Sequence, residues 1–454
     1  MTSLAERGST TRTPMSALPV AIIGAGPVGL AAAALLLERG IEPLVLEAGD
    51  RAGSAIRQWG HIRLFSPWRH VVDPASVRLL EPTGWQLPSP ETAPFGADFV
   101  DQYVAPLAAA LGERVRYGAR VEYVSRLGMD RTRTAGRAET PFVLRLGDGG
   151  EIEARAVIDA SGTFTSPNPV IASGLPLRDA EAVAGHLAHG LSDVLGRERA
   201  RFAGRHTVVV GAGHSAANTL IALGRLMGED ARTTATWLVR NAEPVRVYGS
   251  DADELSDRAS LGAATRALVE SGRVRLVDRF LVTDVEPAGD GRARVVGTHA
   301  GEPAGITADT IVVATGFRPD LDMLREIRLR LDEVVEAPVE LAPLIDPNLH
   351  SCGTVRPHGV DELSHPEPNF WLAGMKSYGR APTFLLLTGY EQVRSIADEL
   401  AGRRTEARKV QLVLPETGVC STNVAGSDAC CGPAPGAAPI RLGHTSTTVD
   451  TPRL

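Results

Sequence analysis

Apolar runs that end in glycine-rich turns give the chain a repeated order of strand, turn and helix. Residues 20–23 are all apolar, and a helical stretch over 31–38 separates them from a second apolar run at 43–46. The same order recurs between residues 206 and 239. Short apolar runs bounded by turn residues predict buried strands, and strands that alternate with helices form parallel sheets. The pattern therefore predicts an α/β fold with two Rossmann-like domains.

Further strands and helices follow from the same kind of pattern. The spacing of Phe99, Tyr103 and Leu107 predicts a helix over 95–111. Residues 147–150 are typical of a hairpin turn, because glycine adopts the positive φ values that a tight turn needs. The other expected strands are 115–124, 142–146, 151–156, 157–162, 274–280, 293–296, 310–316 and 369–374, and a last helix is expected over 383–400.

The first glycine turn has the pattern of a dinucleotide-binding site. Gly24 permits the tight turn, Gly26 lets backbone N–H groups approach a pyrophosphate, and Gly29 lets the helix pack close to the strand. The pyrophosphate then lies at the helix N-terminus, which favours anions. Glu47 follows the second strand about 20 residues further on, where an acid binds ribose hydroxyls. The predicted contacts are Gly24, Gly26, Pro27, Gly29 and Glu47. A strand-to-helix turn without a ligand is the alternative.

A second turn of this kind lies at residues 211–216, where Ala216 replaces the third glycine. Arg240 ends the following strand, at the place where the first unit has Glu47. An acid would repel the 2′-phosphate of NADPH, whereas an arginine can bind it with two hydrogen bonds, so NADPH is favoured over NADH. Arg246 is a second candidate for this role, and a solvated strand end is the alternative for Arg240. The predicted contacts are Gly211, Gly213, His214, Ser215 and Arg240.

Small residues at the ends of other predicted strands mark further cofactor contacts. Where a strand ends in glycine, the backbone can pass close to a bound dinucleotide. A loop that opens at Gly53 could approach a second phosphate or a ring in the same way. The aromatic and arginine residues of 59–68 could lie beside an isoalloxazine ring, or they form a surface loop anchored by two tryptophans. The additional candidates are Ser54, Gly162, Thr315, Gly316 and Gly374.

Two turns with opposite charges at the ribose end imply two different ligands, unless one copy is unused. FAD and NADPH form the simplest redox pair, in which NADPH delivers hydride to the flavin. Chain order indicates that the second unit is inserted into the first. The expected organisation is a disordered arm at 1–17, an FAD-binding domain at 18–200 and 318–402, an NADPH-binding domain at 201–317 and a flexible cysteine-containing tail at 403–454.

Over residues 18–402 the sequence resembles the flavoproteins with two dinucleotide-binding domains. This superfamily includes thioredoxin reductase, class B flavin monooxygenases and N-hydroxylating monooxygenases. The resemblance rests on the two glycine turns, Glu47, the Ala-Thr-Gly sequence at 314–316 and the segment around Gly374. It implies that the first turn holds FAD, that the second holds NADPH, and that residues 314–316 line the junction between the domains.

Departures from the superfamily narrow the expected chemistry. No cysteine precedes Cys352, so the Cys-x-x-Cys dithiol of thioredoxin reductase is missing from its usual position. Met375 follows Gly374 where the disulfide reductases have an aspartate. The Phe-x-Gly-x-x-x-His motif of class B monooxygenases matches residues 183–189 only in a degenerate form, with Val183 in place of phenylalanine.

These features predict an FAD- and NADPH-dependent oxidoreductase. The favoured activity is that of a flavin monooxygenase that oxygenates a small substrate through a flavin C4a-adduct. One alternative is an NADPH-dependent flavin reductase that acts on a thiol-disulfide or metalloid acceptor. Another is a metalloid-binding flavoprotein. Because flavin chemistry needs no side-chain nucleophile, no catalytic residue is assigned.

The composition limits partners and location. A formal net charge of −7 argues against nucleic acid or an anionic membrane as a main partner. Residues 18–37 are apolar enough to suggest a membrane span or signal peptide, but three glycines and Pro27 fit the nucleotide turn better. Four cysteines do not make a disulfide framework in so long a chain. We expect a soluble cytoplasmic protein with a small-molecule substrate, and a homodimer is among the oligomeric states that the sequence allows.

The tail carries three of the four cysteines, Cys420, Cys430 and Cys431. Three thiolates could bind a soft ion such as trivalent arsenic, Cu(I) or Zn. They could instead form a redox disulfide that involves Cys420, or the tail is inert. Residues 414–431 resemble the cysteine-bearing C-termini of flavoproteins encoded near arsenic-resistance functions. That resemblance implies an arsenical as substrate or ligand.

Overall fold

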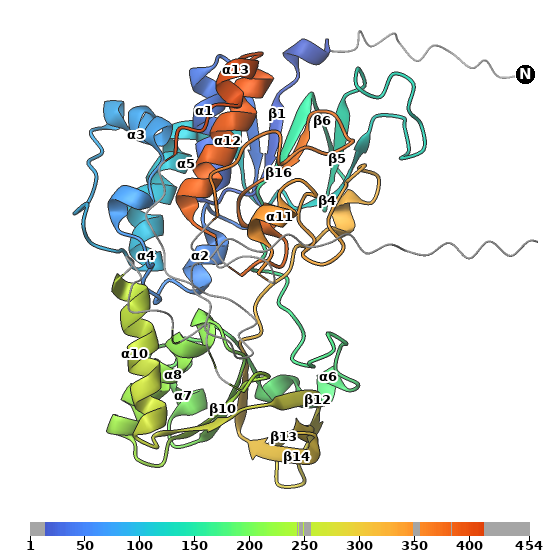
Figure 1. Cartoon of the computed structure of the whole chain (residues 1–454). Helices are drawn as coiled ribbons and strands as arrows, with labels where there is room; N and C mark the ends of the chain where they lie inside the picture. The colour runs from blue at the N-terminus through green and yellow to red at the C-terminus, as the bar shows by residue number, and fades with distance from the viewer. Residues whose placement is uncertain are drawn as a thin grey trace, which may run out of the picture. The chain divides into compact units, whose positions relative to one another are not determined.

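The computed structural model describes residues 14–242, 244, 248, 256–347, 355–382 and 384–412. This part of the chain forms two five-stranded parallel sheets and two three-stranded antiparallel sheets (Figure 1). In chain order, one antiparallel sheet lies between the third and fourth strands of the first parallel sheet. The other lies between the fourth and fifth strands of the second parallel sheet. Helices alternate with the parallel strands, so the prediction of an α/β fold with two Rossmann-like domains is confirmed.

The first parallel sheet has the strand order β16-β7-β1-β2-β3. Its strands are β1 (Val20–Ile23), β2 (Pro43–Leu46), β3 (Val115–Arg116), β7 (Ala156–Asp159) and β16 (Phe370–Leu372). β16 pairs with β7, and Leu372 lies opposite Asp159. Because the whole second parallel sheet lies between β7 and β16 in the sequence, one unit is inserted into the other.

Two apolar layers cover the first sheet. Val20 and Ile22 of β1 pack into a core with α1 (Pro27–Glu38) and α12 (Leu386–Leu400), which lie side by side in Figure 1. The alternate residues of β1 pack against the antiparallel sheet on the other face. α1 is buried from Val28 to Leu36, which explains why this helix is apolar on every side.

The second parallel sheet repeats this layered plan. Its order is β11-β10-β9-β15-β8. α8 and α10 cover one face, and the antiparallel strands β12–β14 cover the other. The bounds are β8 (Leu187–His189), β9 (His206–Val210), α8 (His214–Glu229), β10 (Thr234–Leu238), α10 (Ser256–Glu270), β11 (Val274–Val277) and β15 (Thr310–Val313).

The antiparallel sheets and short helices complete the described elements. One sheet contains β4 (Val121–Arg126), β5 (Phe142–Leu146) and β6 (Glu151–Ala154), and the other contains β12 (Phe280–Pro287), β13 (Ala293–His299) and β14 (Glu302–Ala308). The short α-helices are α2 (Ser54–Gln58), α3 (Pro74–Leu80), α4 (Gly96–Phe99), α5 (Ala105–Leu111), α6 (Ala180–Val183), α7 (Arg199–Phe202), α11 (Ala342–Ile345) and α13 (Arg404–Ala407). A π-helical turn, η4 (Val100–Val104), joins α4 to α5, and 3-10 turns are η1 (Met15–Ala17), η2 (Trp68–His70), η3 (Glu81–Thr83), η5 (Gly112–Arg114), η6 (Ala184–His186), η7 (Asp322–Leu324) and η9 (Gly374–Tyr378).

Two predicted strands are wrong as single elements. The run 115–124 divides into β3, in the parallel sheet, and β4, in the antiparallel sheet, because Gly118 adopts a left-handed φ of 65° between them. The run 274–280 divides in the same way into β11 and the start of β12, where Arg279 has a φ of 45°. Apolar character alone does not reveal such breaks, since both halves remain buried strands.

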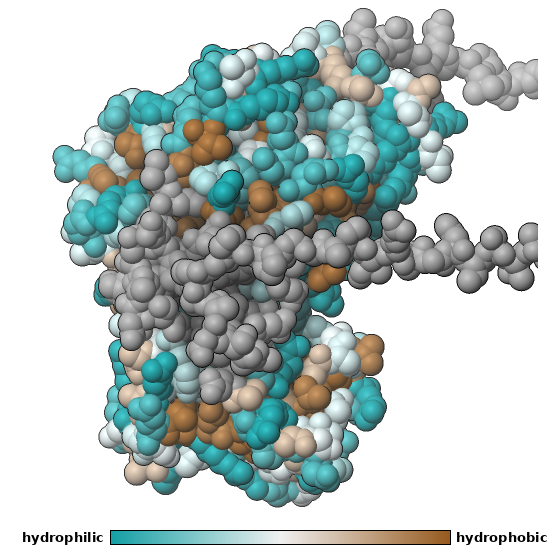
Figure 2. Space-filling view, viewed as in Figure 1, coloured by the Kyte–Doolittle hydropathy of each residue, from teal (hydrophilic) through white to brown (hydrophobic). Residues whose placement is uncertain are grey.

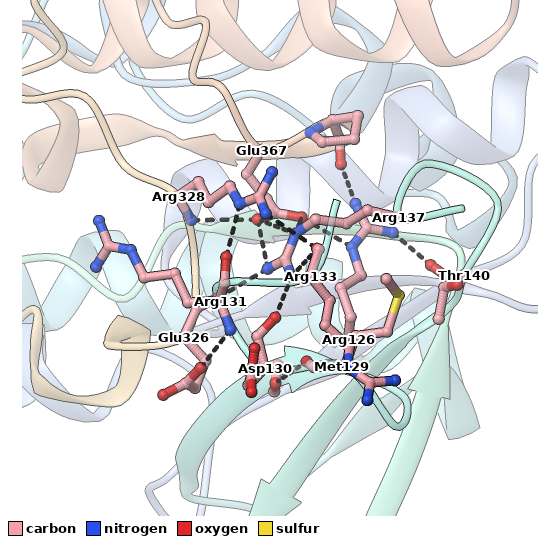
Figure 3. Close-up of polar contacts among 12 residues, drawn as sticks. Arg126, Met129, Asp130, Arg131, Arg133, Arg137, Thr140, Glu326, Arg328 and Glu367 are labelled. Atoms are coloured by element: carbon pink, nitrogen blue, oxygen red, sulfur yellow. Dashed lines mark hydrogen bonds and ion pairs between the residues drawn. The ribbon is translucent and has the colours of Figure 1, made fainter. Parts of the chain in front are cut away.

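A buried charge cluster ties the first antiparallel sheet to β16 (Figure 3). Glu367 accepts from the guanidinium groups of Arg126 and Arg137 at 2.8 Å each, and from the backbone N–H of Arg328 at 3.1 Å. The Arg126 guanidinium also lies 3.6 Å from the ring centroid of Phe142. Burial would raise the pKa of Glu367, but the hydrogen bonds from the two arginines outweigh it and lower the pKa. Both charges of each pair are therefore retained inside the fold.

The folded part extends past residue 402 as far as Leu412. Arg394 of α12 donates to the carbonyl oxygens of Glu406 and Lys409, and Ser395 donates to that of Ala407. These bonds hold α13 against α12. Residues 1–13 and 413–454, which include most of the expected arm and tail, lie outside the described residues.

In the view of Figure 2, hydrophilic residues cover most of the described surface, with apolar residues scattered among them. Among the described residues, none of the helices combines the length and the apolar character needed to cross a membrane.

Candidate functional site

The first glycine turn forms an open cradle at the N-terminus of α1. Gly24 has a φ of 102°, and an added Cβ there would lie 2.9 Å from the carbonyl oxygen of Ala160. At Gly29 an added Cβ would lie 2.0 Å from the carbonyl oxygen of Gly24, so only glycine allows this close packing. Gly26, the N-cap before Pro27, faces open space with no atom within 4 Å of an added Cβ. The turn thus has the shape that a pyrophosphate needs at a helix N-terminus.

Glu47 follows β2 and is bound to the backbone of the turn. Its Oε2 accepts from the N–H of Ala25 and its Oε1 from the N–H of Gly49, both at 2.8 Å. Each carboxylate oxygen has a second lone pair, so both remain able to accept a ribose hydroxyl. Gly53 donates to the carbonyl of Ala25 at 3.0 Å, which brings the start of α2 and Ser54 beside the same turn.

Gly374 follows β16 and is held by a buried network from α12. Gly374 has a φ of 68°, and its N–H donates to Gln392 Oε1 at 2.8 Å. Gln392 Nε2 donates to Ser377 Oγ at 2.9 Å and to His358 Nε2 at 2.8 Å. His358 Nδ1 must carry the proton, because it lies 3.0 Å from the carbonyl oxygen of Arg356. Burial lowers the pKa of His358, so the neutral ring that this network requires is favoured.

A buried lysine lies between the ends of β7 and β16. Lys376 Nζ lies 2.6 Å from Asp159 Oδ2, and these side chains are only 1% and 0% exposed. Lys376 also donates to Ser161 Oγ at 3.0 Å. Sequence reasoning did not assign these residues. The sequence did mark Lys376 as unusual, because Lys376 and Lys409 are the only lysines in a chain with 47 lysine and arginine residues.

The second turn repeats the geometry of the first. Gly211 has a φ of 130°, and an added Cβ would lie 2.1 Å from the carbonyl oxygen of Ala314. Gly213, the N-cap of α8, faces open space like its counterpart in the first turn. Trp237 Nε1 donates to the carbonyl of Gly211 at 2.7 Å and fixes the turn against β10. Arg240 is exposed just beyond β10. His214 and Ser215 form the first turn of α8, whereas Arg246 lies outside the described residues.

The Ala-Thr-Gly segment at 314–316 is hydrogen-bonded to the chain segment that contains Asn168. Asn168 donates from its backbone N–H to Gly316 O at 2.9 Å and from Nδ2 to Thr315 O at 3.1 Å. Thr315 Oγ1 returns a hydrogen bond to Asn168 O at 2.8 Å. The Thr315 hydroxyl proton is therefore engaged within the protein, and the backbone of this segment is fixed.

His189, at the end of β8, lies in an aromatic cluster with Phe317, the residue that follows the Ala-Thr-Gly segment. Its ring centroid is 4.9 Å from that of Phe164 and 5.5 Å from that of Phe317. Burial lowers the pKa of His189. Gly162, two residues before Phe164, has a φ of 73°, and an added Cβ there would meet no atom within 4 Å.

The structure thus brings the predicted residues together in two groups. Gly24, Glu47, Gly162 and Gly374 share the carboxyl edge of the first sheet, and Gly211, Arg240 and Thr315 share that of the second. Cys352, Cys420, Cys430 and Cys431 lie outside the described residues. Within the described ranges, no group of three or more His, Cys, Asp or Glu side chains is arranged to hold a metal ion.

Comparison with known families identifies this arrangement. Residues 21–340 match the family model described as pyridine nucleotide-disulphide oxidoreductase. The chain belongs to this family. Family membership confirms the predicted superfamily of two-domain dinucleotide-binding oxidoreductases.

The proteins that this chain is similar to include a monooxygenase and reductases. Indole-3-pyruvate monooxygenase YUCCA1 of Oryza sativa subsp. japonica is 33% identical over 268 residues, which are 58% of this chain and 56% of the rice protein. The match therefore spans little more than half of that relative. A ferredoxin–NADP reductase of Salinispora tropica is 28% identical over 323 residues, or 70% of this chain and 80% of the reductase. The solved bacillithiol disulfide reductase of Bacillus cereus shares the fold, with 22% identity, a TM-score of 0.62 and coverage of 85% of this chain and 99% of that one.

Proposed function

We propose that the protein is an FAD- and NADPH-dependent flavin monooxygenase that acts on a small molecule. The observation that carries the proposal is the pair of open glycine turns on separate sheets, one followed by Glu47 and the other by Arg240. Two turns that are alike in geometry but opposite in ribose-end charge suit two different dinucleotides.

The residues of the first sheet fit FAD. The N-terminus of α1, opened by Gly26 and Pro27, would hold the pyrophosphate, and Glu47 would accept the adenosine ribose hydroxyls. Ser54 and the small residues Gly162 and Gly374 border the remaining path. When bound, FAD would supply the redox chemistry, with NADPH as the source of electrons.

The residues of the second sheet fit NADPH. Gly211, Gly213, His214 and Ser215 would surround its pyrophosphate at the N-terminus of α8, and Thr315 and Gly316 would border the nicotinamide end. Arg240 would bind the 2′-phosphate. The return of β16 to the first sheet supports an NADPH-binding domain inserted into an FAD-binding domain, with 318–402 as the second part of the FAD-binding domain. The predicted boundary between 18–200 and 201–317 is wrong, because β8 already belongs to the second sheet, so the inserted domain begins before residue 187.

Two facts favour oxygenation over disulfide reduction. None of the described residues is a cysteine, and no dithiol precedes Cys352 in the sequence. The rice relative is named as a monooxygenase. The second candidate is an NADPH-dependent flavin reductase, which is favoured by the likeness to ferredoxin–NADP reductase over 80% of that protein's length. The arsenic link, the tail thiolates, the small-molecule substrate and the cytoplasmic location stay predictions.

The test is rapid anaerobic mixing of the purified flavoprotein with NADPH or NADH, followed by mixing with oxygen. Flavin bleaching that is faster with NADPH supports the cofactor assignment. The substrate screen then measures 18O from labelled dioxygen in products of thioethers and amines, with hydrogen peroxide as the uncoupled product. Reduction with electron transfer to a disulfide, metalloid or ferredoxin acceptor, and no label in any product, would support the reductase instead. Absence of reduction by either nucleotide would contradict both candidates and favour a metalloid-binding flavoprotein.

A further inference from the structure

Four strands end in a row along the carboxyl edge of the first sheet, in the order β2, β1, β7 and β16. Glu47 follows β2, Gly24 follows β1, Asp159 ends β7 and Gly374 follows β16 within two residues. Neighbouring strands lie about 4.8 Å apart, so the row is roughly 14 Å long. A dinucleotide with its ribose at Glu47 and its pyrophosphate at the Gly24 turn therefore continues toward β7. The next part of FAD in that direction is the ribityl chain, which carries three hydroxyl groups.

Ser161 is the exposed polar side chain at the end of β7. Its Oγ donates to Asp159 Oδ1 at 2.7 Å, and its backbone N–H donates to the same oxygen at 3.1 Å. The direction of these bonds is fixed, because a carboxylate with an ion-pair partner only accepts. Since Lys376 only donates, the contact of 3.0 Å from Nζ occupies one of the two lone pairs of Ser161 Oγ. One lone pair is left, so Ser161 presents an acceptor and no donor.

The buried side chains of Lys376 and Asp159 fix the orientation of the Ser161 hydroxyl. Their charged atoms are 2.6 Å apart, and the contact is an ion pair without the alignment of a hydrogen bond. An arginine at residue 376 would bring five N–H groups in a planar fork into the buried space where Asp159 and Ser161 contact Lys376. The compact ammonium group of lysine has fewer N–H groups to satisfy there. This accounts for a lysine in a chain that otherwise uses arginine almost throughout.

We propose that Ser161 accepts a hydrogen bond from a ribityl hydroxyl of FAD, and that Lys376 and Asp159 are the positioning residues that make Ser161 an acceptor only. The inference rests on the proposed FAD site. A hydroxyl is the matching ligand group because it donates, whereas the oxygens of the pyrophosphate only accept and would meet the lone pair of Ser161. The position beside β1 places this contact next to the pyrophosphate.

The experiment measures binding of FAD and of FAD analogues that lack the ribityl 2′-, 3′- or 4′-hydroxyl to apoprotein prepared from the holoprotein. Ser161→Ala should weaken FAD binding about three- to tenfold, the range of one neutral hydrogen bond. One of the three analogues should bind wild type and Ser161→Ala equally, because the partner hydroxyl is already absent. ADP, which ends at the pyrophosphate, should bind both proteins equally.

A double variant tests the positioning residues. Lys376→Met combined with Asp159→Asn removes both buried charges together, so neither is left unpaired. It should weaken FAD binding and lose discrimination against the same analogue. The control Ser125→Ala, in β4, removes a serine hydroxyl that donates to the carbonyl oxygen of Met129, and it should leave all these affinities unchanged.

The results separate the inference from the proposed function. If wild-type apoprotein binds FAD but Ser161→Ala binds it equally well, the ribityl contact is wrong and the FAD site stands. Equal weakening of FAD, all three analogues and ADP would show a structural role and would likewise overturn the inference. Failure of the wild-type apoprotein to bind FAD at all would overturn the proposed function itself.

Discussion

Gly26 and Gly213 are structural counterparts in the two nucleotide turns. Each is the N-cap of the helix that follows, with extended backbone at φ −81° and −115°, and an added Cβ at either position would meet no atom within 4 Å. Because any residue can adopt this backbone, the fold itself does not require glycine at these two positions. The openness of both positions is instead suited to a ligand.

Serine at either position should therefore separate folding from cofactor binding. Serine is a favoured N-cap residue, and its hydroxyl would occupy the same N–H groups that a pyrophosphate needs. Gly26→Ser should keep the stability of the protein but weaken FAD binding roughly ten- to a hundredfold. Gly213→Ser should keep its FAD and lose NADPH affinity by a similar factor. Flavin content and nucleotide titrations measure both effects, and full flavin binding by Gly26→Ser would contradict the first assignment.

Gly29 differs from Gly26 because its requirement is structural. An alanine methyl at Gly29 would lie 2.0 Å from Gly24 O, so α1 must move away from β1. Gly29→Ala should lower the free energy of unfolding by about 3 kcal/mol, as overpacking does. The control is Gly228→Ala, at an exposed site in α8 where an added Cβ would make only an ordinary contact of 4.0 Å with Arg273 Nη2, and it should raise stability by about 0.5–1 kcal/mol. Urea unfolding of the two variants gives the comparison, and equal stability would refute the packing argument.

Arg240 should control the choice between NADPH and NADH. Arg240→Ala removes the cation that would pair with the 2′-phosphate, so the KM for NADPH should rise about tenfold, at the low end for a charged hydrogen bond because the site is exposed. The KM for NADH, which lacks that phosphate, should not change. Arg275→Ala, at an exposed arginine within β11, is the matched control. An equal rise for both nucleotides would assign Arg240 a different role.

Removal of the buried carboxylate at Glu367 should be far more costly than removal of an exposed one. Glu367→Gln leaves Arg126 and Arg137 buried without a counter-charge, and the free energy of unfolding should fall by about 3–5 kcal/mol. Glu151 pairs with Arg145 at 2.7 Å but both are about half exposed, so Glu151→Gln should cost at most about 1 kcal/mol. Since the pKa of Glu367 is lowered in the fold, its contribution should be lost as the pH falls through that pKa, below the ordinary value of 4.5.

Asp73 should give stability the opposite dependence on pH. It caps α3 and accepts from Ser76, but burial raises its pKa from 3.8 to about 6. The folded state therefore binds a proton more tightly than the unfolded state, and the free energy of unfolding should fall as the pH rises from about 4 to about 6. Between pH 4.5 and pH 7, wild type should lose roughly 2 kcal/mol relative to Asp73→Asn. Urea unfolding of both proteins at the two pH values tests this, and a constant difference would refute it.

The sequence was informative where chemistry is local. The strands that precede Gly24 and Gly211, the helices that follow and the charges at Glu47 and Arg240 all lie within short windows, so their spacing could be interpreted directly. Their predicted contacts with cofactors stay predictions. The break at Gly118 was missed because burial is similar in β3 and β4, and only the left-handed φ separates them.

Contacts between distant segments could not be predicted from spacing. Ser161 and Lys376 are 215 residues apart in the chain and meet only because β16 pairs with β7. Gln392 reaches Gly374 for a similar reason, since α12 packs over the sheet that β16 completes. The low number of lysines marked Lys376 as unusual, but its partners depend on the strand order.

The late position of β16 also has a consequence for synthesis on the ribosome. The second parallel sheet is fully encoded between β8 and β15, so it can form on the nascent chain while the first sheet still lacks β16 and α12. Until residues 370–400 emerge, β7 has an unpaired edge and Asp159 has no lysine beside it. The first parallel sheet therefore stays incomplete until the C-terminal part of the chain has been synthesised, and the order of translation makes it the last sheet to be completed.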